Sequence, residues 1–294
     1  MDLKLMARVN GRVLNRFGLR LERTRPLRRD LEEAEAAPQP VPIEEVDDLE
    51  FRATRWHYTV PVEKMVGRPI FGYGPKSWHP LKAACEEIIA TIDAPYETST
   101  LRRFYATFQP KTVAEAHHLD DAGPLGELPV SSLFEPWSLP RPPYDDPFNP
   151  QAPSGTPVFG PQSDDAGEVE WQRLRRSVIS VRDYGYQPRL FPQGRINVTV
   201  LRSQGEERYL VMHGLHRTAV LSAMGHQRIE VGVDHRNPWI VDENQVDDWP
   251  YVRSGFVTRD LAVRNLRRYF TKPETDPASR IGLAVSGTLP EASD

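Results

Sequence analysis

The second half of the chain carries the clearest pattern of hydrophobic and polar positions. Apolar residues recur at helical spacing in some segments and alternate with polar residues in others. In chain order the pattern predicts a helix over 168–181, strands over 196–201 and 208–212 joined by a turn at 203–206, a helix over 215–224, a strand over 229–233, and a last helix over 261–270 capped by Thr258. A fold that mixes helices with a small sheet follows from this order.

The first half predicts helices and then a proline-rich arm. Residues 79–92 have apolar positions at helical spacing, with Ser77 as a candidate cap and Cys85 on the apolar face, where a buried cysteine is expected. Ser99 or Thr98 is expected to cap a second helix. The adjacent His117 and His118 are expected to be exposed. Eleven prolines between residues 124 and 161 predict an irregular covering arm.

Charge separates the N-terminal segment into two parts. Residues 1–29 hold nine Lys or Arg against Asp2 and Glu22, a net +7, whereas residues 30–50 hold nine acidic residues and no basic one, a net −9. Residues 1–17 have an amphipathic helical pattern, which fits either an anionic membrane surface contacted by residues 1–20 or docking on this fold or a partner. The acidic stretch predicts a linker, and residues 273–294 a disordered tail.

Composition limits the class of protein. A net charge of −4 gives no support for DNA binding, which is not expected. The single Cys85 excludes an internal disulfide and a cysteine metal cluster. No apolar run reaches the roughly 18 residues that a membrane span needs, and the N-terminus lacks a secretory signal pattern. We expect a cytoplasmic protein, and the basic N-terminal segment leaves peripheral attachment at the inner face of the membrane open.

The stretch from Tyr209 to Gly225 carries the candidate chemistry. It reads as a strand, a sharp turn at Gly214 and a helix whose first turn holds His216, Arg217 and Thr218. A helix N-terminus presents free N–H groups and a positive dipole end, and an arginine adds a fork of donors. The pattern therefore predicts a phosphate site, with an ordinary strand-to-helix turn as the alternative reading.

The order of these elements resembles the ParB N-terminal/sulfiredoxin-like superfamily over residues 168–235. The likeness rests on a helix with Arg176-Ser177-Val178-Ile179, a Gly185-to-Pro188 break, a strand pair, a Gly-x-His-Arg turn at Gly214, and a helix ending at Met224-Gly225. It implies an α+β fold with a small mixed sheet over 161–272, preceded by an accessory region of helices and proline-rich arm over 51–160. The flanking pieces resemble a bacterial subgroup of that superfamily, whose members often accompany surface-polysaccharide genes; these pieces are Phe159-Gly160-Pro161, Trp249-Pro250-Tyr251-Val252 and Tyr269-Phe270.

The resemblance implies nucleotide handling. Gly214, His216 and Arg217 match the family's phosphate turn, so the resemblance implies ATP or CTP with Mg²⁺, or another phosphorylated small molecule, as the ligand. Leu215 stands where sulfiredoxins keep their catalytic cysteine, so sulfiredoxin chemistry is not expected. His213 replaces the acidic residue that related kinases place before the glycine, which weakens the kinase reading.

Three functions follow from this site. The first is a phosphotransferase or NTPase in which Arg217 binds phosphate and His216 stabilises charge or moves a proton. It needs a carboxylate, for which Glu168, Glu170 and Asp183 are the nearest candidates, each with a surface charge as the alternative. The second is a nucleotide or sugar-phosphate sensor, and the third a membrane-surface scaffold in polysaccharide assembly. Zinc held by His213, His216 and His226 is not favoured, and no metal site is predicted.

Overall fold

The computed structural model describes residues 41–42, 58–120, 122–130, 135–138, 158–188, 195–233 and 238–271. The predicted basic helix within 1–29, most of the 30–50 linker, much of the proline-rich arm and the tail 273–294 lie outside these ranges. Within the stretch expected to be a linker, Val41 and Pro42 form a short strand. Within the described ranges, no helix is both long and apolar enough to cross a membrane.

A mixed sheet forms the centre of the described fold. Its strands are β1 (Val41–Pro42), β2 (Tyr58–Pro61), β3 (Met65–Val66), β4 (Asn197–Ser203), β5 (Glu206–His213), β6 (Arg228–Val233) and β7 (Ile240–Asp242). The order is β1-β2-β6-β4-β5-β3, and β7 also pairs with β4. The β4–β5 and β2–β6 pairs are antiparallel, whereas β4–β6, β4–β7, β3–β5 and β1–β2 are parallel. The expected α+β class with a mixed sheet is confirmed.

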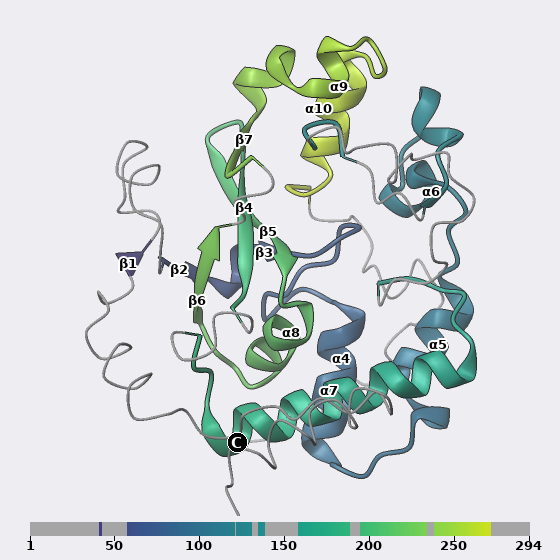
Figure 1. Cartoon of the computed structure of the whole chain (residues 1–294), viewed down its shortest axis with the longest axis vertical. Coiled ribbons are helices and arrows are strands. Elements are labelled where there is room, and N and C mark those ends of the chain that lie inside the picture. The colour runs from purple at the N-terminus through teal and green to yellow at the C-terminus, as the bar shows by residue number, and fades with distance from the viewer. Residues whose placement is uncertain are drawn as a thin grey trace, which may run out of the picture.

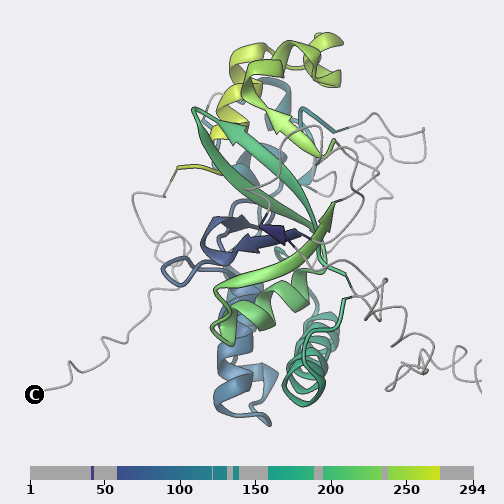
Figure 2. The ribbon, with the colours of Figure 1, turned by 90° about the vertical axis from the view of Figure 1, so that its left-hand side faces the viewer.

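Helices cover the sheet in two layers (Figures 1 and 2). The first layer contains α4 (Pro80–Ala90), α5 (Thr100–Thr107), α7 (Asp164–Tyr184) and α8 (Leu215–Ala223), with the short η2 (Val62–Lys64) and η3 (Tyr96–Thr98). The second contains α6 (Val113–His117), η4 (Gly123–Gly126), η8 (Glu243–Asp248), α9 (Pro250–Arg253) and α10 (Arg259–Arg267). Each layer packs on the sheet through its own cluster of buried apolar side chains, called here the first and the second cluster. Strand alternation divides them: Val198 and Val200 of β4 belong to the first cluster, and Leu201 belongs to the second.

The sheet and the first core continue across the expected boundary at residue 160. Strands β2 and β3 precede that boundary and pair with β6 and β5, which follow it. The first cluster likewise joins residues of α4 and α5 to residues of α7 and α8. Helices of the expected accessory region therefore form part of the same core as the expected sheet domain.

Local signals identified two helix caps correctly, but α7 begins four residues before the predicted start at 168 and α10 ends three residues before the predicted end at 270. Ser99 caps α5 by accepting from the Arg102 N–H, and Thr258 caps α10 by accepting from the Leu261 N–H. The cap of α4 is His79 rather than Ser77. Cys85 is fully buried, as expected. The exposure expected for His117 is wrong: its ring lies against Tyr269 in the second layer, which tertiary packing decides.

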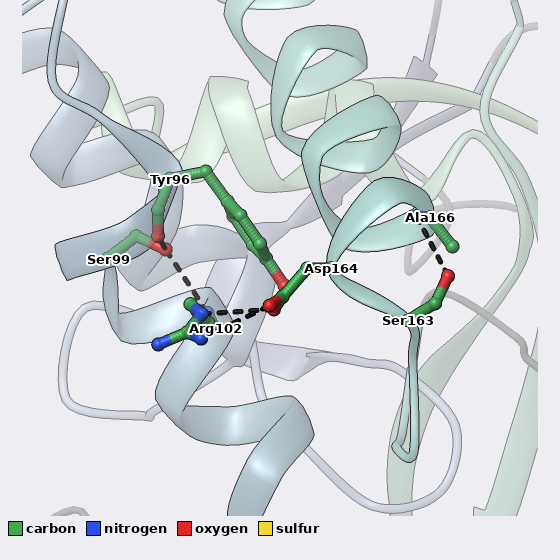
Figure 3. A network of polar contacts seen from close by, with 6 residues as sticks. All are labelled: Tyr96, Ser99, Arg102, Ser163, Asp164 and Ala166. Carbon is green, nitrogen blue, oxygen red and sulfur yellow. Dashed lines mark hydrogen bonds and ion pairs between the residues drawn. The ribbon is translucent and has the colours of Figure 1, made fainter.

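Contacts at the start of α7 fix that helix against α5 (Figure 3). Ser163 caps α7, and Asp164 receives two hydrogen bonds from the Arg102 guanidinium at 3.0 and 3.2 Å. Gly167 lies so close to Tyr96 that a Cβ at this position would come 1.8 Å from the Tyr96 hydroxyl oxygen. Because the Arg102–Asp164 pair is exposed, the close approach of Gly167 to Tyr96 is the contact that positions the next turn of α7, which carries Glu170.

Candidate functional site: the N-terminus of helix α8

The turn between β5 and α8 requires glycine at position 214 for two reasons. Gly214 has φ +85° and ψ +28°, in the left-handed region that L-residues with a side chain seldom adopt. A Cβ at this position would also come 2.9 Å from Cγ1 and 3.0 Å from Cα of Ile196. The chain can therefore pass from strand to helix here only because Gly214 lets it approach the start of β4.

Among the described residues, no side chain caps the first turn of α8, whose N-cap residue is Gly214. The N–H groups that open the helix are thus left to solvent or to a ligand, at the positive end of the helix dipole. The predicted Arg217 lies in this turn, half-buried, and no described residue forms a hydrogen bond or ion pair with its guanidinium. Thr218 is fully buried, and its hydroxyl donates to the Gly214 carbonyl at 3.1 Å, so it turns back into the helix.

Two residues predicted to be catalytic meet, although 46 positions separate them in the sequence. The Nε2 atom of His216 on α8 lies against the Oε1 atom of Glu170 on α7. The second carboxylate oxygen of Glu170 accepts from Arg173 at 3.3 Å. Glu170 is only 5% exposed, so the alternative reading as a surface charge is wrong for it. The carboxylate fixes one nitrogen of the His216 ring and thereby its orientation.

Electrostatics keeps the Glu170 carboxylate ionised. Burial by itself would raise the pKa of Glu170. The hydrogen bond and charge of His216, followed by those of Arg173, outweigh that effect and hold the pKa below its ordinary value. An ionised carboxylate against an imidazole is the arrangement that orients a histidine for proton transfer.

Asp183 does not join this pair. It is exposed near the C-terminal end of α7 and contacts its neighbour Arg182. At 1.5 Å rise per residue, the helix separates it from Glu170 by about 20 Å. Glu168 is half-buried and accepts from Gln172 at 2.7 Å. Of the three candidate carboxylates, only Glu170 contacts His216.

Two residues near the turn were not predicted as site residues. The hydroxyl of Tyr186 accepts the Ile196 N–H at 3.0 Å, and burial raises its pKa while the charges of Arg217 and Arg195 act against that rise. The stem of Arg195 lies over Gly232, whose added Cβ would come 2.8 Å from Arg195 Cδ. The sequence offered a signal for Arg195, because it is a basic residue directly before the predicted strand 196–201. The first residue of that strand, Ile196, lies beside Gly214.

This arrangement favours an anion. Arg217 and the N–H groups that open α8 supply positive charge and donors at the Gly214 turn, and the charges of Arg217 and Arg195 both act on Tyr186. Within the described residues, no group of three or more His, Cys, Asp or Glu side chains could hold a metal ion. Helix N–H groups and an arginine fork are donors of the kind that phosphate oxygens accept.

Comparisons with protein-family models, with characterised proteins and with solved structures found no significant match for this chain.

Proposed function

We propose that this protein binds a nucleotide or another phosphorylated small molecule at the N-terminus of α8, in the manner of ParB/sulfiredoxin-like domains. One observation carries the proposal. Arg217 is half-buried beside an uncapped helix N-terminus, and no described residue pairs with its guanidinium. An unpaired arginine loses hydration without gaining a protein partner, and a phosphate would supply one.

In this proposal the binding residues act together on the phosphate. Arg217 donates two parallel hydrogen bonds to phosphate oxygens, and the first N–H groups of α8 donate along the helix axis. Gly214 keeps the backbone close enough for that contact, and Arg195 adds charge. ATP or CTP is the expected nucleotide, and Mg²⁺, where present, would neutralise phosphate charge.

The contact between His216 and Glu170 favours an NTPase or phosphotransferase over a sensor. Glu170 orients the ring, and His216 holds a proton or stabilises charge at the phosphate. In this reading Glu170 is a positioning residue, because it contacts His216 and not the ligand. A sensor would need only the binding residues, so the alternatives differ in whether His216 affects product release.

A thermal-shift panel tests binding first. ATP, CTP, ADP and nucleotide sugars are added with and without Mg²⁺, and at least one is expected to raise the unfolding temperature. No shift with any of them would contradict both the enzyme and the sensor. Release of phosphate or ADP then distinguishes the two: His216→Ala should abolish release while leaving the thermal shift, and Glu170→Gln should lower release and alter its pH profile.

The charge of residues 1–29 supports a further part of the proposal, peripheral attachment of a cytoplasmic protein to the membrane. A link to surface-polysaccharide metabolism rests on the resemblance to ParB/sulfiredoxin-like proteins alone. Nine basic residues against two acidic ones suit an anionic lipid surface. Co-sedimentation with vesicles that contain anionic lipid tests it. Deleting residues 1–20 should abolish sedimentation, and unchanged sedimentation would contradict attachment through this segment.

A further inference from the structure

Buried polar atoms gather in the second layer, away from the α8 site. Among the described residues, five such atoms on four side chains of this layer have no hydrogen-bond partner: Arg68 Nε, His117 Nδ1, Thr199 Oγ1, Asn265 Nδ2 and Asn265 Oδ1. Asn265 is fully buried, Thr199 is 1% exposed and His117 is 2% exposed. Protein interiors pair such groups, with other protein groups or with ordered water, so an amide with both ends unpaired calls for an explanation.

Strand and helix registers place Thr199 and Asn265 in this layer. Thr199 lies opposite Leu210 in the β4–β5 pair and shares its strand face with Leu201, and both leucines belong to the second cluster. Asn265 lies on α10 one turn after Leu261, which belongs to the same cluster. The hydroxyl and the amide are therefore enclosed between the sheet and α10.

Arg68 and His117 belong to one polar cluster at the edge of the same layer. Arg68 Nη2 donates to Glu135 at 2.9 Å and contacts the Met212 sulfur at 3.2 Å. Glu135 also accepts from the Tyr269 hydroxyl at 3.0 Å, and the His117 ring lies edge-on to Tyr269 with ring centres 5.9 Å apart. The unpaired Arg68 Nε is a donor, whereas His117 is neutral, because burial lowers its pKa to about 3.

The chemistry of these atoms limits the class of ligand that could pair with them. The Glu135 carboxylate and the Asn265 carbonyl oxygen disfavour an anion, and the Arg68 guanidinium disfavours a cation. The remaining set mixes donors with acceptors, which a neutral molecule that both donates and accepts would satisfy. Water is the smallest such molecule, and buried water of this kind commonly pairs polar groups inside proteins.

We infer that the layer between the sheet and α10 binds ordered internal water, which completes the hydrogen bonds of Arg68, Thr199 and Asn265. The water joins α10 to the sheet through polar groups that the chain itself leaves apart. This inference is independent of the proposed nucleotide site, because none of its residues lies on α7 or α8.

A matched pair of threonine variants tests the inference on the full chain. Thr199→Val and Thr218→Val each replace a buried threonine with a residue of the same shape that lacks the hydroxyl. The Thr218 hydroxyl has a protein acceptor, whereas the Thr199 hydroxyl has no partner among the described residues. If water pairs with Thr199, both variants should lower the unfolding temperature to a similar extent. An unchanged or raised temperature for Thr199→Val would show a dry site and overturn the inference.

A second measurement keeps the test independent of how the variants fold. A high-resolution crystal structure of the wild-type chain should show water oxygen within hydrogen-bond distance of the Asn265 amide nitrogen. Continuous protein packing around that amide, with no water peak, would contradict the inference. Asn265→Leu replaces the amide with an apolar side chain of similar shape. This variant should lower the unfolding temperature if internal water pairs with the amide, and should raise it if the site is dry.

Discussion

Two buried glutamates, one in each layer, are held by positive partners in different ways. Glu170 in the first layer pairs with His216 and Arg173, whose side chains are 27% and 58% exposed. Glu135 in the second layer is completely buried and pairs with Arg68, which is 17% exposed, and with the buried Tyr269. One carboxylate faces partners that solvent or a ligand can reach, and the other is enclosed.

The difference separates a residue suited to chemistry from a residue suited to holding the fold. His216 and Arg173 are partly exposed, so each can turn to water if its contact with Glu170 is lost. The ion pair of Glu135 and Arg68 cannot be hydrated in the same way, so removing one charge leaves the other buried without compensation. A buried carboxylate is therefore no sign of a site unless its partner is accessible.

The largest expected effect is a difference in the free energy of unfolding between alanine variants of the two glutamates. Glu135→Ala should lower the free energy of unfolding by about 3–5 kcal/mol, because Arg68 loses its partner in a buried position. Glu170→Ala should cost less, about 1–3 kcal/mol, because Arg173 and His216 can turn to solvent. Urea unfolding of both variants measures this, and an equal or larger loss for Glu170→Ala would contradict the comparison.

The next effect concerns the two glycines at the ends of α8. Gly214 and Gly225 have φ of +85° and +83°, so alanine at either position pays left-handed strain of about 1–2 kcal/mol. Only at Gly214 would the new Cβ meet a neighbour, Ile196, since nothing lies within 4 Å at Gly225. Gly214→Ala should therefore lower the unfolding free energy more than Gly225→Ala does. Equal losses would show that Ile196 does not restrict the turn.

A smaller effect is expected in the pH dependence of stability. The pKa of His117 falls from 6.5 to about 3 on burial, so the unfolded chain binds a proton that the folded chain does not. Stability is then lost as pH falls below about 6.5, by at most about 1.4 kcal/mol per pH unit for this group. His117→Gln should flatten that slope.

Urea unfolding at several pH values between 7 and 4 measures the slope. Part of it should remain in the His117→Gln variant, because burial also lowers the pKa of His79 to about 3. An unchanged slope in the variant would mean that His117 titrates normally in the folded chain and that the second layer admits the charged ring.

Short-range signals in the sequence predict the turn at Gly214. Contacts that depend on long-range packing could not be predicted in this way. Gly214 and Gly225 delimit α8 by their own backbone preference, so the sequence indicates the strand, the turn and the helix. The meeting of Glu170 with His216 depends on how α7 crosses α8, which no local pattern reveals. Glu135 lies in a proline-rich stretch without periodicity, and only its burial against Arg68 and Tyr269 identifies it.

Binding at Arg217 is the central claim, and calorimetric titration of the full chain with ATP and with CTP, each with Mg²⁺, tests it most directly. The wild type should bind at least one of them, and Arg217→Ala should weaken that affinity at least tenfold, or about 1.4 kcal/mol. Arg176→Ala, on the exposed surface of α7, is the matched control and should bind as the wild type does. Equal affinity for the wild type and Arg217→Ala would contradict the account.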